Sequence, residues 1–358
     1  MMNMKNQYDV VIVGAGPAGA GAAKALTASG LETLMVEHDA MPRYKMCSGV
    51  LFPGSVKTVA EDFGELPEEV FCQPREIKGN RAYITEEAPC FELSFSAFGD
   101  DESLPENGLN IRRAELDQWL CQKSDARIID HCRFEGCEKE GDGYIIKLKH
   151  EGQELTVRSR YLVGADGTMS RVRKTAFPDF DEKIGLIPNY EEFYRGSIDL
   201  EPGWLYLFLD RKFTGFFATV FHKDDIIVVV TGVKHKEPVK EYFQAFKKHL
   251  EDKHGLRVDD KIDSHGIMLH DMSASKNYCL GENNLLLAGE AGGFLRGGEG
   301  ITSSLVSGRA AGQAILKSKE SGRPAIDFFD ELARPELDAC EKVHAGLAAA
   351  AGFNVFMR

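Results

Sequence analysis

The sequence lacks the cysteine patterns that would define a metal-binding or disulfide-linked protein. Its eight cysteines are scattered along 358 residues without a C-x-x-C pair. The closest two, Cys132 and Cys137, are accompanied by no histidine pattern. We therefore predict that the protein binds no metal and carries free thiols in a reducing cytoplasm.

Basic residues are also scarce, since 56 acidic residues against 43 basic ones leave a net charge of −13. Because a nucleic-acid backbone repels such a chain, we predict no nucleic-acid partner. No apolar run reaches the roughly 18 unbroken residues of a membrane-spanning helix. The first apolar run is itself a predicted strand, so we expect no signal peptide.

Internal repeats and low-complexity tracts are missing as well. With 43% hydrophobic residues, a chain of this length predicts a large globular core and two domains. The last apolar residues, 347–356, leave three interpretations open: packing, dimerisation or peripheral contact with a membrane surface.

The feature that organises the chain is a glycine-rich turn at residues 14–19. It follows an apolar strand over Val10–Val13 and has G-x-G-x-x-G spacing. Gly14 permits the tight turn, Gly16 lets a pyrophosphate approach the backbone, and Gly19 lets the next helix pack closely. The pattern predicts a dinucleotide site, with an unliganded glycine turn as the alternative.

The residues after this turn support the same prediction. A helix over residues 17–29 begins at Pro17, where a proline loses no helical hydrogen bond, and directs its first N–H groups at the phosphates. A second strand over residues 33–36 ends in Glu37, at the distance where a carboxylate binds the ribose hydroxyls of an adenosine. An acid here favours FAD or NAD over NADP.

A turn-rich loop after Glu37 carries a cysteine with two interpretations. Cys47 is either a small packing residue or a thiol beside a reactive ring. Arg43 and Lys45 would favour its thiolate form in the second case.

Two further strands run into glycine turns. The strand ending at Val163 leads into residues 164–171, which form either a second contact with the same ligand or an ordinary β-turn. Residues 284–288 lead into residues 289–301 and then a helix over 302–316. Glu290 could accept hydrogen bonds from a sugar-like chain, and the helix dipole could stabilise a negative charge.

A predicted helix begins near Arg113, and its apolar residues at 116, 119 and 120 mark one buried face. A cation in the first turn opposes the helix dipole, which mildly favours a ligand contact over a solvated side chain.

The distribution of predicted short strands along the chain divides it into two predicted domains. Residues 71–98 and 180–272 are rich in short strands and predict one antiparallel sheet in a substrate domain. Residues 1–70, 99–179 and 273–358 form a discontinuous nucleotide-binding domain of α/β type. Aromatic residues of the β-rich part are core by default, but could instead line an apolar pocket; the lining candidates are Trp204, Tyr206 and Phe208.

Together, the three turns resemble the FAD-dependent group that includes aromatic hydroxylases, flavin halogenases and geranylgeranyl reductases. The resemblance covers nearly the whole chain and implies a Rossmann-like FAD-binding domain with an inserted antiparallel substrate domain, an α/β fold that is α+β overall. It implies FAD as cofactor, with the ADP half at the first turn, the pyrophosphate near the second and the ribityl chain at the third. The implied cofactor-binding residues are Gly14, Gly16, Pro17, Ala18, Gly19, Glu37, His38, Arg43, Cys47, Ser48, Arg113, Asp166, Gly167, Gly289, Glu290, Gly293, Gly300 and Ile301.

Within this group, the loop over residues 42–49 looks like the Lys-x-Cys-Gly-Gly loop of the reductase branch. Residues 299–301 match that branch's Gly-Glu-Gly-Ile. Three departures stand out: Ser48 replaces a glycine, Glu290 replaces an aspartate, and residues 296–298 replace a proline-containing approach to the flavin. Residues 203–208 lack the halogenases' Trp-x-Trp-x-Ile-Pro element.

The resemblance therefore implies a reductase of isoprenoid carbon–carbon double bonds, with Cys47 and Gly49 near the flavin ring. The alternatives are a flavin monooxygenase acting on an apolar or aromatic substrate, and a non-catalytic electron carrier. The implied partners are an apolar or lipid substrate and an electron donor, either NAD(P)H or a small redox protein.

Overall fold

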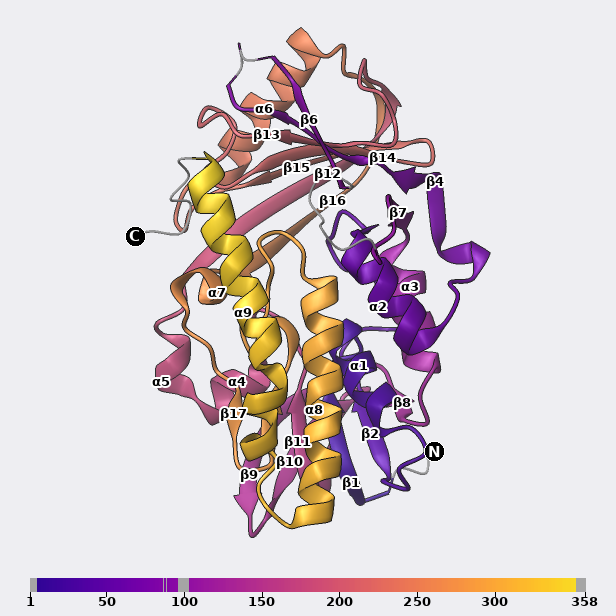
Figure 1. The fold of residues 1–358 in the computed structure, drawn as a ribbon, viewed down its shortest axis with the longest axis vertical. Coiled ribbons are helices and arrows are strands. Elements are labelled where there is room, and N and C mark those ends of the chain that lie inside the picture. Colours follow the sequence, from indigo (N-terminus) through magenta and orange to yellow (C-terminus); the bar gives the residue numbers. More distant parts are fainter. Residues whose placement is uncertain (1–4, 86, 88, 96–102, 352–358) are drawn as a thin grey trace. The chain divides into compact units, whose positions relative to one another are not determined.

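A computed structural model describes residues 5–85, 87, 89–95 and 103–351 of the chain. The chain forms two compact units (Figure 1). The first unit comprises Met1–Arg43, Ala114–Ile184 and His270–Arg358, and the second Tyr44–Arg113 and Gly185–Leu269. The described residues of 44–70 and 103–113 thus pack in the second unit, whereas the sequence analysis assigned them to the nucleotide-binding domain. The predicted domain division stays a prediction, because compact packing does not by itself define an independent domain.

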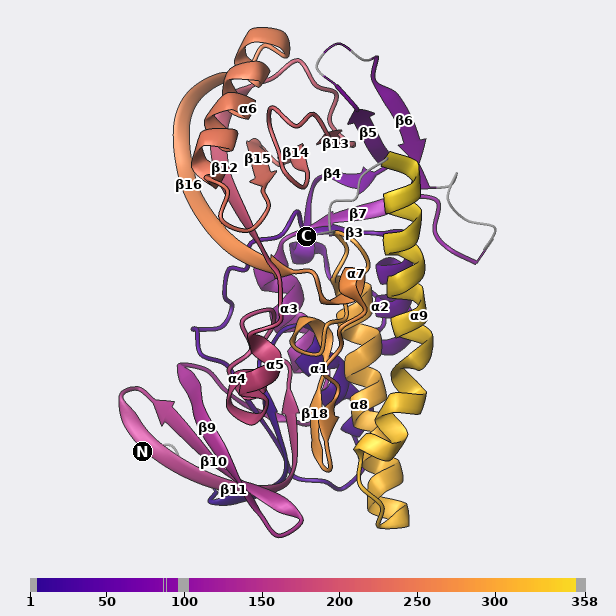
Figure 2. The same cartoon turned by 90° about the vertical axis from the view of Figure 1, so that its left-hand side faces the viewer.

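The first unit is built on an eight-stranded sheet with a parallel centre, and the order along its main path is β17-β18-β11-β1-β2-β8. Central strand β1 has a parallel strand on each side. Strands of a parallel sheet are covered on both faces, which explains why the buried half of β1 is apolar. Strands β9 and β10 extend β11 as antiparallel hairpins, seen side-on in Figure 2. The strands are β1 (Gln7–Val13), β2 (Thr33–Val36), β8 (Arg127–Ile129), β9 (Cys132–Glu140), β10 (Gly143–His150), β11 (Gln153–Gly164), β17 (Gly281–Glu282) and β18 (Leu285–Leu287).

Two helices of the first unit pack against each other through small residues. An added Cβ at Gly308 of α8 would lie 2.1 Å from the carbonyl oxygen of Ala18 in α1, and one at Gly21 would lie 2.6 Å from that of Leu305. Only glycine permits this approach. Helices α8 and α9 lie side by side in both ribbon views (Figures 1 and 2). The helices are α1 (Pro17–Leu26), α3 (Arg113–Gln122), α4 (Arg171–Ala176), α5 (Pro178–Asp181), α7 (Met272–Ser275), η3 (Gly289–Ala291), α8 (Ile301–Ser321) and α9 (Ile326–Ala351).

The second unit is built on a seven-stranded sheet with the order β16-β12-β15-β14-β13-β5-β6. As expected, strands from both β-rich stretches share this sheet, although β13 and β5 pair in parallel. Strand β4 of the first β-rich stretch is an exception, because it joins a separate three-stranded sheet, β3-β7-β4. The strands are β3 (Val50–Leu51), β4 (Phe71–Ile77), β5 (Gly79–Tyr83), β6 (Phe91–Ser94), β7 (Gly108–Ile111), β12 (Leu186–Ser197), β13 (Leu205–Phe208), β14 (Ala218–Lys223), β15 (Ile226–Gly232) and β16 (Arg257–His270).

The two faces of the seven-stranded sheet pack against different elements. One face packs against α6 (Val239–Lys253) through Phe243, Phe246 and Leu250. The other carries Leu205, Phe221, Val228 and Val230 and is covered in part by the loop residues Met46 and Phe52. The remaining helices of this unit are α2 (Pro53–Phe63) and the short η1 (Glu68–Val70).

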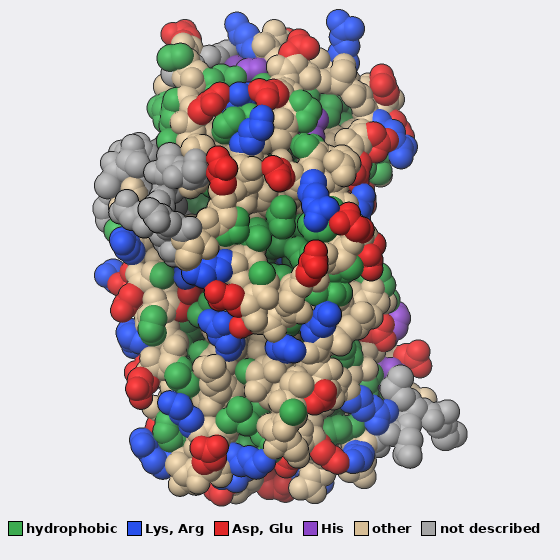
Figure 3. All heavy atoms as spheres, turned by 45° about the vertical axis from the view of Figure 1, so that its right-hand side comes forward, with side chains coloured by type: hydrophobic (Ala, Val, Ile, Leu, Met, Phe, Trp, Pro, Cys, Tyr) green, Lys and Arg blue, Asp and Glu red, His purple; other side chains and the backbone are tan. Residues whose placement is uncertain are grey.

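Two observations concern the surface and the C-terminal end. Acidic and basic side chains are interspersed over the face drawn in Figure 3. Within the described residues, no helix has the length and apolarity needed to cross a bilayer. The side chains of the apolar segment 347–356 lie outside the described residues, so its three interpretations stay predictions.

Candidate functional site

The three predicted glycine turns lie side by side at one edge of the first unit's sheet. Strands β1, β11 and β18 are parallel neighbours, with Val13 opposite Gly164 and Gly164 opposite Leu287. Ala165 N–H donates to the Val13 carbonyl and Ala288 N–H to the Gly164 carbonyl. Because the carboxyl ends of parallel strands meet at one edge, a single extended ligand can contact all three turns.

The first turn has the geometry that its glycines predict. Gly14 has φ +108°, and a Cβ there would lie 2.3 Å from the carbonyl oxygen of Ala165. A Cβ at Gly19 would lie 2.0 Å from the carbonyl oxygen of Gly14. At Gly16 the nearest atom to an added Cβ is the Arg43 guanidinium, at 3.3 Å, so this glycine faces a cation. No side chain among the described residues caps α1, which leaves its N-terminus available to an anion.

Glu37 ends β2 beside this turn and is 3% exposed. Its Oε2 accepts from Ala15 N–H at 2.9 Å, and its Oε1 accepts from His38 N–H at 2.9 Å. Ion pairs with Arg43 Nε at 3.0 Å and His38 Nδ1 at 2.7 Å complete its surroundings. Burial alone would raise the pKa of Glu37, but His38, Arg43 and the Ala15 N–H outweigh it and lower the pKa to about 2. The carboxylate is therefore ionised at neutral pH.

Arg43 joins Glu37 to a residue that sequence reasoning missed. Its Nη1 donates to Oδ2 of Asp117 at 3.0 Å, and Asp117 is fully buried on α3. Cys121, one turn later, donates its thiol to the Ala15 carbonyl at 3.4 Å. Helix α3 thus holds the Arg43 guanidinium over the first turn. Only the i, i+4 spacing of Asp117 and Cys121 could have indicated this buried polar face.

The predicted contact of Arg113 with the cofactor stays a prediction. Arg113 is the first residue of α3 and is 7% exposed, so it is not a solvated side chain.

Asp166 of the second turn binds the start of the next helix, and its predicted contact with the cofactor stays a prediction. Its Oδ2 accepts from the N–H groups of Arg171 at 2.7 Å and Val172 at 3.1 Å, and its Oδ1 accepts from Ser170 Oγ at 2.5 Å. Burial raises the pKa of Asp166, and these hydrogen bonds offset part of that rise. The carboxyl group thus satisfies the first N–H groups of α4. Gly167, with φ +75°, has open space where its Cβ would stand.

The third turn carries Glu290, which is 8% exposed. Thr168 Oγ1 of the second turn donates to Glu290 Oε2 at 2.6 Å, so the two turns are joined directly. A Cβ at Gly300 would lie 3.2 Å from Glu290 Oε1, which explains the glycine there. The contact of Glu290 with a polyol chain stays a prediction.

One side chain, that of Glu299, limits what the rest of the third turn can bind. Glu299 Oε1 accepts from the N–H groups of Ile301 and Thr302, both at 2.9 Å, and so caps α8. The expected use of the α8 dipole for an anionic ligand must therefore compete with this carboxylate. Gly293 and Gly289 are tight packing positions with φ +101° and +61°.

Sequence reasoning also missed Arg173, which is 1% exposed. Its Nη2 donates to the Thr168 carbonyl at 2.7 Å and its Nη1 to the Ala291 carbonyl at 2.9 Å. Its Nε donates to Asp181 at 2.8 Å. This one guanidinium fastens the second turn to the third.

The Cys47 loop, residues 44–52, belongs to the second unit. The predicted approach of Cys47, Ser48 and Gly49 to a flavin ring stays a prediction. Cys47 Sγ accepts from Gly49 N–H at 3.4 Å. Lys223 Nζ anchors the loop by donating to the carbonyl oxygens of Gly49 at 3.4 Å and Ile111 at 2.7 Å, and to Asn110 Oδ1 at 2.9 Å. Burial lowers the pKa of Lys223.

The structure does not support Trp204, Tyr206 and Phe208 as pocket-lining residues. Tyr206 and Phe208 are 2% and 1% exposed and pack in the core beneath α6. Trp204 belongs to the same cluster and is covered by Arg81, whose guanidinium carbon lies 4.4 Å from the ring centroid. The side chains of β13 that face the other way, Leu205 and Leu207, belong to the apolar face under the Cys47 loop.

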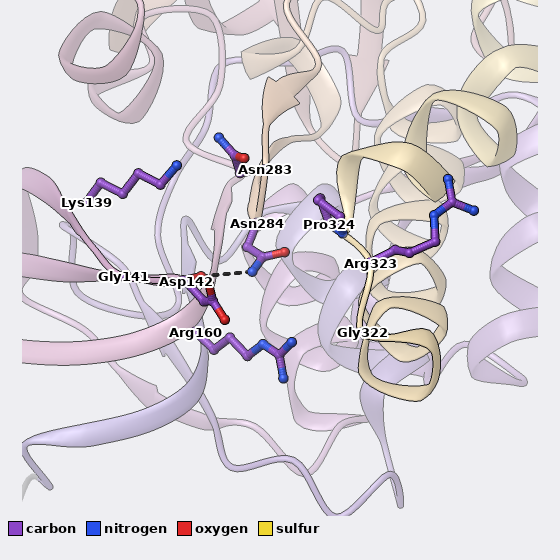
Figure 4. A pocket seen from close by; sticks show the side chains of 9 residues that line it. All are labelled: Lys139, Gly141, Asp142, Arg160, Asn283, Asn284, Gly322, Arg323 and Pro324. Carbon is purple, nitrogen blue, oxygen red and sulfur yellow. Dashed lines mark hydrogen bonds between the residues drawn. The ribbon is translucent and has the colours of Figure 1, made fainter.

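A shallow pocket at the opposite end of the strands is separate from the three turns (Figure 4). Asn284 crosses it, donating to the Asp142 carbonyl at 2.8 Å and accepting from Ala325 N–H at 3.0 Å. These two bonds link the hairpin turn at Asp142 to the start of α9, and the pocket is lined mainly by polar residues.

The parallel sheet, its glycine turn, the buried acid and the paired third turn define a flavoprotein of the Rossmann type. A model of the FAD binding domain family matches residues 7–291, so the chain belongs to that family and FAD is its cofactor. The residues present fit FAD. Gly16 and the uncapped α1 can receive its pyrophosphate, and Glu37 and Glu290 supply carboxylates that can accept hydrogen bonds from its hydroxyl groups. The protein is therefore an FAD-dependent oxidoreductase.

Known proteins similar to this chain include reductases. The digeranylgeranylglycerophospholipid reductase of Methanocella arvoryzae is 28% identical over 93% of this chain and 84% of its own length. The chloroplastic geranylgeranyl diphosphate reductase of Arabidopsis thaliana is 27% identical over 90% of this chain and 68% of its own. A geranylgeranyl bacteriochlorophyll reductase-like protein from Thermoplasma acidophilum shares the fold, with a TM-score of 0.82, 21% identity, and coverage of 99% of this chain and 88% of that one.

We expect the affinity for FAD to increase with pH because His38 competes for Glu37. A carboxylate offers about four lone-pair sites, and those of Glu37 already meet His38, Ala15 and Arg43. The hydrogen bond and charge of Glu37 raise the pKa of His38. Ribose binding that displaces the charged imidazole releases a proton, so affinity rises as pH rises through that pKa, by at most about tenfold per pH unit.

This prediction is checked by titrating apoprotein with FAD and following fluorescence quenching from about pH 6 to pH 9. His38→Ala should bind FAD with little dependence on pH over this range. His235→Ala, which removes an exposed histidine of the second unit, should keep the wild-type dependence. A wild-type affinity that is flat or falls with pH would show that His38 does not compete.

Proposed function

We propose that this protein reduces carbon–carbon double bonds of an isoprenoid lipid of the geranylgeranyl type. The observation that carries the proposal is the loop of residues 44–52, which covers an apolar sheet face through Met46 and Phe52. This loop bears the Lys45, Cys47 and Gly49 that resemble the reductase branch. The reductase names of the relatives support the same substrate class.

The chain's own residues would divide the work between the two units. In the first unit, Glu37 and Glu290 orient the two ends of the cofactor by accepting hydrogen bonds from its hydroxyls. In the second, Met46, Phe193 and Leu207, which are only partly buried, offer an apolar surface that excludes water from a prenyl chain. Bound FAD, once reduced, supplies the hydride. NAD(P)H and a small redox protein are both proposed as its source.

Product mass tests the proposal. The purified flavoprotein is reduced anaerobically with dithionite and given geranylgeranylated lipid, while a parallel sample receives NAD(P)H and air. We expect a gain of two hydrogens per double bond without oxygen. Gain of an oxygen atom in air alone would assign the protein to the monooxygenases, and an unchanged lipid in both samples would refute the lipid substrate.

A further inference from the structure

The first half of the Cys47 loop has no regular secondary structure. Strand pairing begins only at Val50, after residues 44–49. Gly49 is firmly anchored, because its carbonyl accepts from Ile111 N–H at 2.7 Å. Gly49 has φ +61°, and a Cβ there would lie 2.4 Å from the Ile111 carbonyl oxygen, so only glycine fits. Residues 44–48 are therefore an irregular segment that ends at a fixed glycine.

Tyr44, at the start of this segment, contacts two strands of the second unit's sheet. Its ring stacks on His265 of β16 with centroids 4.2 Å apart, and it meets Phe193 of β12 edge-on at 6.0 Å. Its hydroxyl donates to Oε1 of Glu191 on β12. Tyr44 is nevertheless 45% exposed, so solvent already reaches the residue that makes these contacts.

Met46, two residues further on, packs against a buried apolar face of the same sheet. The face consists of four side chains that are at most 7% exposed: Leu205, Phe221, Val228 and Val230. Phe193 and Leu207 pack against these four and are only partly buried. Methionine is unbranched and adapts to irregular surfaces, so its contacts with this face are exchangeable. A prenyl chain offers apolar contacts of the same kind.

Glu191, the partner of Tyr44, is buried with few hydrogen-bond donors. It is 0% exposed, and its Oε2 has no hydrogen-bond partner among the described residues. The next residue, Glu192, lies on the other face of β12 and accepts from Lys261 and the Tyr190 hydroxyl, both at 2.7 Å. A buried polar atom without a partner is costly. Movement of Tyr44 would let water supply the hydrogen bond that Glu191 lacks.

The groups around Glu191 and Tyr44 determine how this pair responds to pH. Burial raises the pKa of Glu191 to about 8, although the Tyr44 hydrogen bond and the Lys223 charge lower it and Asp263 adds to the rise. The other titratable or charged groups that act on the pair are Lys223 of β14, Asp263 and His265 of β16, and Cys47 of the loop itself. The residue of β15 opposite Glu191 is Val230, which carries no charge. The closed arrangement therefore favours the neutral acid.

We propose that residues 44–48 form a lid over this apolar face, latched by the hydrogen bond from Tyr44 to Glu191 and hinged at Gly49. The inference rests on the proposed function, because it describes how a prenyl chain reaches its binding surface. Opening lifts Met46 from the face and lets the chain enter between them. It also brings water to Glu191, which then loses its proton to solvent and becomes a carboxylate. The latch keeps the face covered when no chain is bound.

The lid should open more readily as pH rises. Glu191 has a raised pKa of about 8 when the lid is closed, and contact with water returns it towards the ordinary value of 4.5. The buried acid therefore stabilises the closed lid fully below about pH 4.5, and this stabilisation is lost as pH rises through about 8. Between these values the opening constant should rise by at most about tenfold per pH unit.

Cleavage by trypsin after Lys45 measures the open lid in FAD-loaded protein, because a protease cuts an opened state in proportion to its population. Tyr44→Phe keeps the ring and removes only the latching hydroxyl. We expect it to raise the cleavage rate at neutral pH by about 5- to 100-fold, as the loss of a buried hydrogen bond predicts. Tyr194→Phe is the matched control, because it removes the hydroxyl that binds Glu192 on the other face, and it should leave the rate unchanged. A Tyr44→Phe rate within about twofold of wild type would overturn the inference.

Glu191→Gln tests whether opening releases a proton. The ratio of wild-type to Glu191→Gln cleavage rates cancels the pH dependence of trypsin itself. This ratio should rise from about pH 6.5 to about pH 8, by at most about tenfold per pH unit. A ratio that stays level or falls over this range would show that opening takes no proton from Glu191, and the latch would then be wrongly assigned.

Binding of geranylgeraniol, measured by equilibrium dialysis, separates this inference from the proposed function. Because the latch must break before the chain enters, Tyr44→Phe should bind geranylgeraniol more tightly than wild type, by the same factor that it gains in cleavage rate. An unchanged affinity, with wild-type binding intact, would overturn the lid. Failure of the wild type to bind or reduce the lipid would instead overturn the proposed function, and the cleavage rates would still decide whether the lid exists.

Discussion

Replacing Arg173 by methionine is expected to lower the free energy of unfolding by about 3–5 kcal/mol and to release FAD on purification. The guanidinium is 1% exposed and donates to the carbonyls of Thr168 and Ala291. Methionine has similar length but no donor, so both carbonyls and Asp181 lose a partner, and unpaired buried groups are costly. Since those carbonyls belong to the second and third turns, the variant loses the Arg173 link between the turns and keeps only the hydrogen bond from Thr168 to Glu290 as a direct side-chain link described here.

Urea unfolding and the ratio of flavin to protein absorbance measure the two effects. Arg171→Met is the matched control, because Arg171 lies on the same helix with its side chain 52% exposed and only a long 3.8 Å ion pair to Glu135. That control should stay within about 0.5 kcal/mol of wild type and keep its FAD. A stable, yellow Arg173→Met protein would mean that the sheet and the hydrogen bond from Thr168 to Glu290 hold the turns without Arg173.

The second large effect concerns the dependence of stability on pH. A carboxyl group whose pKa is raised in the folded state stabilises the protein fully below its unfolded pKa, and this contribution is lost as pH rises through the folded pKa. For Glu191 the pKa rises from 4.5 to about 8. Wild type should therefore lose stability over that range, by at most about 5 kcal/mol from this group.

Glu191→Gln should remove this loss, so its unfolding free energy should exceed that of wild type at about pH 9 and approach it at about pH 5. Urea unfolding at both values measures the difference. Glu192→Gln should behave in the opposite sense, because the lowered pKa of Glu192 stabilises the protein as pH rises. Parallel pH curves for wild type and Glu191→Gln would show that Glu191 is ionised in the folded protein.

Local sequence signals predicted the parts of the fold that local chemistry determines. The strand–glycine–helix order of residues 10–19 and the acid at the end of β2 are set within one βαβ unit, and the structure has them. The antiparallel pairing of β14 and β15 likewise follows from a short connection between two apolar strands. The same holds for the three turns, which follow three apolar strands.

Local patterns did not determine directions and distant partners. A carboxylate so close to a helix start as Asp166 can cap the helix, bind a ligand or do both, so spacing does not decide its role and its cofactor contact stays a prediction. Tyr206 and Phe208 alternate with Leu205 and Leu207, and only tertiary packing decides which face α6 covers. The contact of Arg173 with Ala291 spans 118 residues, so no local pattern contains it.

The glycine contacts between α1 and α8 have a consequence for binding. These helices follow the first and third turns, and Gly21 and Gly308 bring their backbones together without side chains that could change rotamer. The two turns therefore keep a fixed separation before any cofactor arrives. Binding then costs little conformational entropy, and the fixed spacing of the two turns limits the length of the molecule that they can bind together.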